Sequence, residues 1–517
     1  MNSSPAGNGF FARFSISQLW MGLIGLTLLM RLPAIIHPAA IDDEVIYSVV
    51  ANEMVAGGLP YLDAIERKPP LLFWLFESIF ELFGVYNWYA LHFIGFLWIL
   101  LSMYGLFLIG RDLFNWQTGW VAAMLYAIFQ PWAYWKNIAF NGEVLMNLPI
   151  IWAIWLCIRP TASKWRLEVL IAGMFLCAGF LLKQPAAIAA IPLGLYFLLP
   201  AYAKKRQLPW AWGFGHASLL VVGFFGALAL TAGMLYRQGI LEEAYFWIFT
   251  HHDVPHGITD PVFWIRGGRI GIAYAAACFP LMLGAYWSIR NKEGLWQGKK
   301  PAFFVLWTSL IAALIGTSAS GRFYPHYYIQ LTPILGMLAA PIIAQLLSGK
   351  ATADRWWLKE RFWTGSLMVL AIGFTFSAAV GLWNHRQPEE TGRYIKANSK
   401  VEDRIFVWGQ HTRIYLDAQR RPASRFVACF PLTGYIFGSP LSWDPDHDTS
   451  DKIVEGAWPK LFEDFEKRPP VYFVDQDAAR KTAKYPLSMF PDLETYVQQN
   501  YELVHKAPKS WIYKRKD

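Results

Sequence analysis

Acidic and basic side chains gather in four short segments of this 517-residue chain, and each segment lies beside a long apolar run. Carboxylates can take up or release a proton, and lysine or arginine can bind an anion. Side chains of both kinds on one membrane surface could therefore catalyse a reaction of a charged substrate. The segments are Asp42-Asp43-Glu44, Glu66-Arg67-Lys68, Asn141-Gly142-Glu143 and Arg322 to His326.

Each segment also has a purely structural interpretation. The first acidic run could cap a helix, because anionic groups favour a helix N-terminus. Lys68 could be an interfacial anchor that extends its ammonium group toward water. The aromatic run 323–328 could be an interfacial belt, although a belt requires neither Arg322 nor His326. Glu143 is harder to explain in this way, because a carboxylate at the mouth of an apolar span is costly.

The elements that must position these segments are mostly membrane helices. The chain is 55% hydrophobic and 16% charged, whereas globular proteins are about 25% charged. Eleven apolar runs are long enough to cross a hydrocarbon layer of about 30 Å. They are residues 18–36, 86–110, 118–137, 143–158, 167–182, 184–201, 212–236, 268–289, 302–318, 327–347 and 362–383. We therefore predict a mainly α, polytopic membrane bundle of about 11 transmembrane helices.

A further apolar stretch, residues 70–83, determines the topology of everything after it. It is short and carries Glu77 and Glu81, so it reads as an interfacial or re-entrant helix that does not cross the membrane. With Arg13 inside, all later basic clusters between spans then fall on the cytoplasmic side. The four polar segments and the C-terminus are consequently predicted outside. Because these loops account for the net charge of +9, we expect no nucleic-acid partner.

The composition changes near residue 384. Charged residues make up about 30% of residues 384–517 and about 11% of the chain before them. We therefore divide the chain into a transmembrane domain, 1–383, and a soluble extracytoplasmic domain, 384–517. Two short apolar runs, 404–409 and 471–475, predict buried strands, and amphipathic stretches around them predict a small α/β domain. No glycine-rich nucleotide-binding motif follows either strand.

Taken together, the motifs resemble those of the bacterial GT-C glycosyltransferases, which include the protein O-mannosyltransferases and the lipid A aminoarabinose transferases of the family 39 type. The matching segments are Asp43-Glu44 with Tyr47, Lys68-Pro69-Pro70-Leu71-Leu72, Asn141-Gly142-Glu143, Lys183-Gln184-Pro185, Arg322 to Tyr328, and Val407-Trp408-Gly409 with Tyr415. The resemblance implies transfer of a sugar from a polyprenyl-phosphate-linked donor to a lipid, glycan or protein acceptor. It places the reaction on the outer face of the bacterial inner membrane.

The resemblance also implies roles for individual residues. An inverting transfer needs a base on one side of the anomeric carbon and positive charge around the departing phosphate on the other. Asp43 matches the family's first acidic motif and is expected to be the base, while the other carboxylates orient the acceptor, hold a cation or tune Asp43. The predicted residues are Asp43, Glu44 and Glu143 for catalysis, Lys68, Arg322 and His326 for the donor phosphate, and Tyr47 and Tyr327 for substrate binding.

Two positions depart from the aminoarabinose transferases. Those enzymes have an arginine where Ile46 stands and a glutamate where Arg67 stands, which favours another member of the superfamily. In that family the glutamate helps to bind a metal ion together with a histidine from a later loop. Here Glu66, with His251 or His252, could bind a divalent metal ion, or these could be ordinary polar loop residues.

Two functions from other classes remain as alternatives. A transporter or flippase of lipid-linked sugars would also need basic groups at the membrane surface, but it should carry ionisable groups near mid-bilayer. In this sequence such groups are predicted to lie at one face. A non-catalytic binder of lipid-linked sugars is disfavoured because Asp43, Lys68 and Glu143 are all retained.

Overall fold

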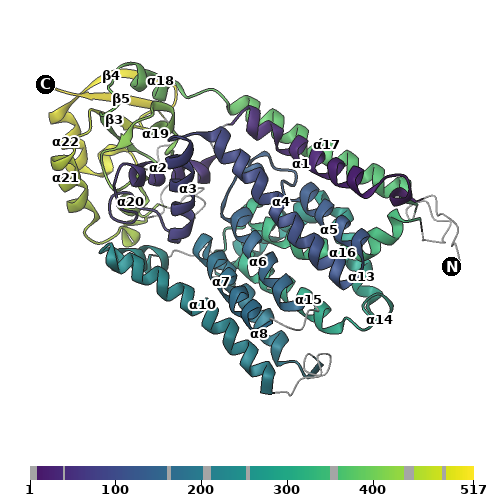
Figure 1. The fold of residues 1–517 in the computed structure, drawn as a ribbon. Helices are drawn as coiled ribbons and strands as arrows, with labels where there is room; N and C mark the ends of the chain where they lie inside the picture. Colours follow the sequence, from purple (N-terminus) through teal and green to yellow (C-terminus); the bar gives the residue numbers. More distant parts are fainter. Residues whose placement is uncertain are drawn as a thin grey trace, which may run out of the picture. The chain divides into compact units, whose positions relative to one another are not determined.

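The helices and strands of the chain belong to two units. The first unit consists of residues 1–38, 91–233 and 260–383, and the second of residues 39–90, 234–259 and 384–517. The computed structural model describes residues 9–38, 41–159, 165–201, 211–251, 257–349, 359–435, 448–479 and 485–517. Figure 1 labels the elements of both units.

All the regular elements of the first unit in its described residues are helices. Its elements are η1 (Phe10–Ala12), α1 (Ile16–Ile36), most of α4 (Trp88–Leu113), α5 (Trp116–Phe129), η2 (Trp135–Ile138), α6 (Gly142–Ile158), α7 (Trp165–Leu182), η3 (Gln184–Ala189), α8 (Ala190–Leu198), most of α10 (Ala211–Arg237), α12 (Pro261–Ala277), α13 (Phe279–Arg290), α14 (Lys292–Leu295), α15 (Lys300–Ser318), η5 (Pro325–Leu331), α16 (Thr332–Leu347) and α17 (Glu360–His385). Every apolar run predicted to span the membrane contains a helix.

Several of these helices are long and apolar enough to cross a membrane. In the described part of the chain there are 6 such helices, namely α1, α4, α10, α15, the η5–α16 segment and α17. The predicted span 268–289 is instead a pair of helices, α12 and α13, which meet at a bend of 89°. Pro280 opens α13, and a proline cannot donate the backbone hydrogen bond that would continue α12. The helical membrane fold is thus confirmed, while the count of eleven crossings stays a prediction.

Helices of the first unit pack closely through small residues and through side-chain contacts near their ends. A Cβ atom at Gly173 of α7 would lie 2.2 Å from the carbonyl oxygen of Leu220 in α10, so only glycine allows this approach. Helices α1 and α17 run side by side (Figure 1), with Arg13 near Glu360 at one end and His37 against Trp383 at the other. Helices α7 and α10, and helices α1 and α17, are therefore closely packed pairs.

The second unit combines helices with a small sheet. Its helices are α2 (Asp42–Val55), α3 (Pro70–Phe83), α11 (Leu241–Tyr245), η4 (Phe246–Thr250), α18 (Glu390–Ala397), α19 (Arg413–Ala418), α20 (Phe430–Thr433), η8 (Ser450–Lys452), α21 (Ala457–Lys467), η9 (Leu487–Met489) and α22 (Pro491–Asn500). Its strands are β1 (Arg404–Trp408), β2 (Arg421–Pro422), β3 (Tyr472–Asp475), β4 (Tyr501–Ala507) and β5 (Ser510–Arg515).

The sheet has the strand order β2-β1-β3-β5-β4. Strand β1 pairs in parallel with β2 and β3, and β5 pairs antiparallel with β3 and β4. Strands β1 and β3 are almost wholly buried, because helices pack on them: the ring of Phe465 on α21 lies 4.9 Å from that of Phe406 on β1. The two strands predicted from short apolar runs are thereby confirmed.

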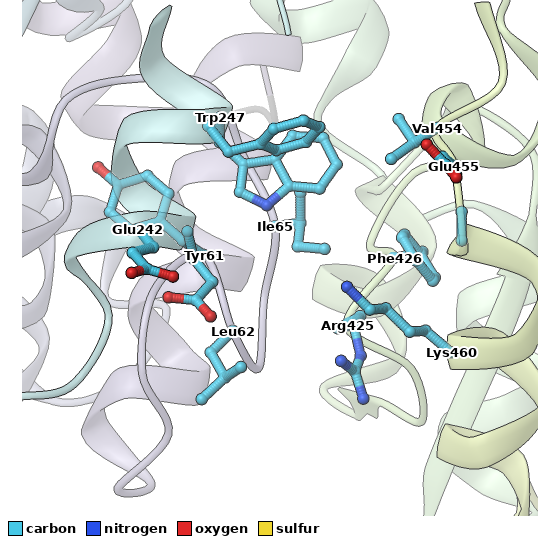
Figure 2. Close-up of a pocket in the computed structure, with 13 residues that line it drawn as sticks. Tyr61, Leu62, Ile65, Glu242, Trp247, Arg425, Phe426, Val454, Glu455 and Lys460 are labelled. Atoms are coloured by element: carbon cyan, nitrogen blue, oxygen red, sulfur yellow. The ribbon is translucent and has the colours of Figure 1, made fainter. Parts of the chain in front are cut away.

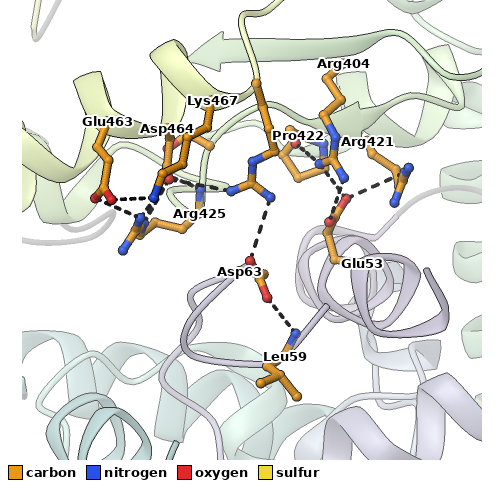
Figure 3. A network of polar contacts seen from close by, with 12 residues as sticks. Glu53, Leu59, Asp63, Arg404, Arg421, Pro422, Arg425, Glu463, Asp464 and Lys467 are labelled. Carbon is orange, nitrogen blue, oxygen red and sulfur yellow. Dashed lines mark hydrogen bonds and ion pairs between the residues drawn. The ribbon is translucent and has the colours of Figure 1, made fainter. Parts of the chain in front are cut away.

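An ionic network ties α2 and the loop after it to the sheet and its helices (Figure 3). Arg404 of β1 donates hydrogen bonds to both carboxylate oxygens of Glu53 on α2, at 2.9 and 3.3 Å. Asp63 in the loop lies 3.7 Å from Arg468, and it also accepts a hydrogen bond from the N–H of Leu59. The segment between α2 and α3 is therefore fixed by residues more than 300 positions later in the chain.

Candidate functional site

The first acidic motif opens helix α2 in the second unit. Ile41 precedes the helix in an extended conformation and provides no side-chain cap, so the carboxylates of the first turn supply the negative charge that a helix N-terminus favours. Glu44 is completely buried, whereas Asp43 is half-buried. Of these two carboxylates, Asp43 is therefore the one that a substrate could reach.

Lys68 lies at the end of the loop between α2 and α3 and is held at its backbone on both sides. Its N–H donates to Glu66 Oε2 at 2.7 Å, and its carbonyl accepts a hydrogen bond from the hydroxyl of Tyr61 at 2.7 Å. Its ammonium group lies 3.6 Å from Glu66 Oε1 and 6.0 Å from the ring centre of Tyr47. A simple interfacial anchor needs no such fixation. Pro70 opens α3 immediately afterwards, as its position in the sequence predicts.

Tyr61 supports this arrangement from a strained position. Its φ angle is +68° and its side chain is 1% exposed, and a non-glycine residue in this region costs energy that neighbouring contacts must offset. Burial, and to a lesser extent the nearby charge of Glu66, raises the pKa of Tyr61 well above its ordinary value. Its hydroxyl therefore stays protonated and keeps donating to the Lys68 carbonyl.

Two of the predicted metal ligands, Glu66 and His251, have other contacts in the structure. Glu66 accepts the hydrogen bond from the Lys68 backbone. The ring of His251 lies among those of Phe246, Trp247 and Phe430, at centroid distances of 6.0, 5.2 and 5.9 Å. His252 is outside the described residues. Among the residues that are described, no group of three or more histidine, cysteine or acidic side chains could hold a metal ion.

Glu143 occupies the first turn of α6 in the first unit. Asn141 caps this helix by accepting a hydrogen bond from the N–H of Val144. Glu143 is completely buried and forms an ion pair with Lys183, whose side chain is 8% exposed. His326 Nε2 lies 3.9 Å from the same carboxylate oxygen. The carboxylate is therefore neutralised by a buried cation.

This pairing changes the expected role of Glu143. A carboxylate that accepts the hydrogen bond of a buried ammonium group cannot also act as the general base while the pair is intact. It can, however, position Lys183, whose Nζ lies 4.7 Å from the ring centre of Tyr327. Sequence reasoning left Lys183 out of the site, although it begins the Lys183-Gln184-Pro185 motif and directly follows an apolar span.

Arg322 belongs to a group of three arginines that we call the arginine cluster: Arg266, Arg269 and Arg322. The guanidinium groups of Arg269 and Arg322 are both close enough to Arg266 to repel its charge. The hydroxyl of Tyr328 donates to the carbonyl of Gly267 at 3.0 Å, which fixes this loop on α12. Two further positive charges beside Arg266 favour the binding of an anion there.

Sequence reasoning missed Arg266 and Arg269. Their spacing of three positions puts them on one face of α12, and basic residues are rare inside a segment that is otherwise apolar enough to enter a membrane. Two arginines on one face of an otherwise apolar helix are therefore the sequence feature that could have identified them. Their proximity to Arg322, more than fifty residues later, becomes visible only in the folded chain.

The predicted residues form two groups, one in each unit. The second unit holds Asp43, Glu44, Tyr47, Glu66, Lys68 and His251, and the first unit holds Glu143, Arg322, His326 and Tyr327. Tyr47 is buried against Phe73 and Phe76. The ring of Tyr327 lies 4.8 Å from that of His326.

The sequence and the fold resemble those of known proteins. A family model described as dolichyl-phosphate-mannose-protein mannosyltransferase matches residues 67–225. The fold is similar to a crystal structure of ArnT from Cupriavidus metallidurans bound to undecaprenyl phosphate, with a TM-score of 0.62 and 15% identity over 96% of this chain and 98% of that chain. Among curated proteins, no sequence matches.

Archaeal structures share the fold as well. The oligosaccharyltransferase AglB from Archaeoglobus fulgidus, in complex with an inhibitory peptide and a dolichol-phosphate, has a TM-score of 0.52 and 12% identity over 98% of this chain and 75% of that chain. The Archaeoglobus fulgidus oligosaccharyltransferase in complex with Zn and sulfate has a TM-score of 0.54 and 13% identity over 96% and 73%. The resemblance predicted from the sequence motifs is confirmed at the level of the fold.

Proposed function

We propose that this chain, which has the fold of the GT-C glycosyltransferases, transfers a sugar from a polyprenyl-phosphate-linked donor to a lipid, glycan or protein acceptor. The observation that carries the proposal is the arginine cluster, in which Arg269 and Arg322 both lie close enough to Arg266 to repel its charge. The family match and the polyprenyl-phosphate and dolichol-phosphate ligands of the similar structures support the same donor class.

In the proposed reaction, an acceptor oxygen attacks the anomeric carbon of the donor sugar. The bond between that carbon and the phosphate oxygen breaks, and the polyprenyl phosphate leaves with the bonding electrons. Asp43 takes the proton from the acceptor hydroxyl. Lys68 and the arginine cluster bind the phosphate and stabilise the charge that develops on it. Glu143 contributes by holding Lys183 and His326 in place.

A divalent metal ion would supply further positive charge beside the phosphate, and a similar structure was solved with Zn. Glu66 and His251 are its candidate ligands in this chain, since carboxylate oxygen and imidazole nitrogen are both zinc donors. The third ligating side chain that such a site needs does not stand beside them in the described residues. Metal analysis of the purified wild type and of Glu66→Gln tests this. A stoichiometric metal ion in the wild type that is absent from Glu66→Gln would show that Glu66 binds a metal.

The proposal places the chain in the bacterial inner membrane with the reacting groups and the C-terminus outside. The basic loops support this orientation through the positive-inside rule. An epitope inserted after Lys299 is expected on the cytoplasmic side, and one at the C-terminus outside. A cytoplasmic C-terminus would contradict the orientation.

Binding of undecaprenyl phosphate in lipid nanodiscs tests the phosphate site directly. Removing a charge that is desolvated around a phosphate costs about 2–5 kcal/mol, so Arg266→Met, Arg322→Met and Lys68→Met should each weaken binding about 30-fold or more. Arg290→Met is the matched control, because Arg290 ends α13 and contacts Tyr286 rather than the cluster. Unchanged binding in all three test variants would refute the phosphate site.

The rate of sugar transfer tests whether Asp43 is the general base. Asp43→Asn preserves the shape of the side chain but removes its basicity, so transfer to a hydroxyl acceptor should fall on the order of 10² to 10⁴-fold. Donor binding should stay unchanged. Near-normal turnover in Asp43→Asn would refute the assignment, and binding of the donor phosphate without transfer from any donor would favour a non-catalytic binder.

A further inference from the structure

A pocket of about 290 Å³ opens within the second unit. One wall comes from the loop around residues 61–65 and from α11 with η4, and the opposite wall comes from residues 425–426 and 454–460 (Figure 2). A backbone hydrogen bond of 2.8 Å from the N–H of Ile65 to the carbonyl of Arg425 joins the two walls. The pocket is therefore built from segments that are fixed to one another.

Aromatic rings provide much of the pocket surface. Tyr61, Phe246, Trp247 and Phe426 all line it. Trp247 is held in place by edge-on contacts with Phe246 at 5.0 Å and with Phe430 at 6.4 Å. Rigid aromatic faces can cover the C–H face of a sugar ring, and the indole N–H can donate a hydrogen bond to a hydroxyl group.

The charges in the pocket are mostly negative. Arg425 is neutralised by Asp464, which receives its guanidinium hydrogen bonds at 2.8 to 3.2 Å. The pocket is also lined by three carboxylates, Glu242, Glu243 and Glu455, and by one further cation, Lys460. In the described part of the chain, none of these four side chains has an ion-pair partner. Carboxylates accept hydrogen bonds from hydroxyl and ammonium groups, but their excess repels phosphate and other anions.

We propose that this pocket binds one or two sugar rings that are neutral or carry an amino group, and that it excludes anionic sugars. The volume lies at the lower end of the range of about 300–1,000 Å³ for small-molecule pockets, which suits one or two rings and is small for a folded partner. The lining combines aromatic faces with a few polar groups that can fix the orientation of the rings. We take the bound sugar to be part of the acceptor, and this step rests on the proposed function.

Saturation-transfer NMR with the full-length protein in nanodiscs tests the pocket. The probes are chitobiose, mannobiose and glucose 6-phosphate at millimolar concentration. The wild type should transfer saturation to the first two and not to the sugar phosphate. Glu243→Gln should weaken binding several-fold, and Trp247→Leu about tenfold or more. Glu502→Gln is the matched control, because Glu502 is exposed on β4 outside the pocket and should leave binding unchanged.

Two results would overturn the inference. One is a wild type that binds none of the neutral or amino sugars. The other is binding that Glu243→Gln and Trp247→Leu leave unaltered. Because Trp247 is buried and its replacement could unfold the unit, the half-exposed Glu243 provides the independent variant.

The pocket and the proposed function can fail separately. Lys68→Met should lose undecaprenyl phosphate binding and transfer while keeping sugar binding. Sugar binding without any transfer in the wild type would refute the proposed function alone. Transfer that is insensitive to Glu243→Gln, in a protein that binds no sugar probe, would refute the pocket alone.

Discussion

The buried pair of Glu143 and Lys183 allows a quantitative prediction. Both side chains are almost fully removed from solvent, at 0% and 8% exposed. Lys183→Met leaves a buried carboxylate without its main counter-charge, which typically costs about 3–5 kcal/mol. Glu143→Gln should cost less, because the amide oxygen can still accept a hydrogen bond from the ammonium group. The free energy of unfolding in denaturant, followed in detergent micelles, measures both losses.

The double variant Glu143→Gln/Lys183→Met carries neither charge. Its loss should therefore be smaller than the sum of the two single losses by about 2 kcal/mol or more, because neighbouring charges are not energetically independent. Lys300→Met provides the matched control. Lys300 lies 3.5 Å from Glu293, but the two side chains are 74% and 76% exposed, so its loss should stay below about 1 kcal/mol.

The same two single variants and their double variant separate a structural role of the Glu143–Lys183 pair from a functional one. If the pair only stabilises the fold, the double variant should recover both stability and transfer. We expect it to recover stability alone, since His326 and Tyr327 then lose the charged neighbours that position them. The reasoning would be refuted if Lys183→Met were no more destabilising than Lys300→Met, or if the two single losses simply added.

Three further substitutions test the geometry. In Gly142→Ala the new Cβ would lie 2.8 Å from Lys183 Cδ, so we expect about 1–3 kcal/mol of destabilisation. The control Gly215→Ala places its Cβ in open space and should be neutral. Equal effects of the two substitutions on stability would contradict this expectation. Glu53→Gln leaves two arginines without their carboxylate and should cost about 3 kcal/mol, seen as faster proteolysis of the second unit; unchanged proteolysis would count against the network. Burial raises the pKa of Asp475 from 3.8 to about 6, so its contribution to stability is fully present below about pH 4 and is lost as the pH rises through 6, by about 3 kcal/mol. The stability difference between wild type and Asp475→Asn should show that loss between pH 4 and pH 7, and a difference that does not vary with pH would refute it.

Local features of the sequence predicted most of the fold. The start of α3 follows from Pro70, whose missing N–H is not needed in the first turn. Strands β1 and β3 follow from short apolar runs. The bend of 89° between α12 and α13 was not predicted, because a run of apolar residues shows that a helix is long enough to cross a membrane but not whether it does so straight.

The candidate site was less predictable, because its contacts join distant parts of the chain. The motif around Glu143 indicated a costly buried carboxylate, but its partner Lys183 comes forty positions later. Likewise Arg322 belongs to a recognisable aromatic loop, while Arg266 and Arg269 belong to none of the motifs and lie more than fifty positions before it. Charge pairing of this kind depends on tertiary packing, which one sequence without an alignment does not reveal.

The loop that carries Lys68 shows what the C-terminal region contributes. Asp63, Ile65 and Arg67 each contact that region, through Arg468, the carbonyl of Arg425 and the ring of Phe430 respectively. A loop with a strained Tyr61 at its centre needs such external contacts, because its own backbone would relax to a lower-energy conformation. Substitutions at these contact residues should therefore alter the binding of phosphate by Lys68 before they unfold the sheet. A C-terminal region that served only as a separate accessory domain would not couple to Lys68 in this way.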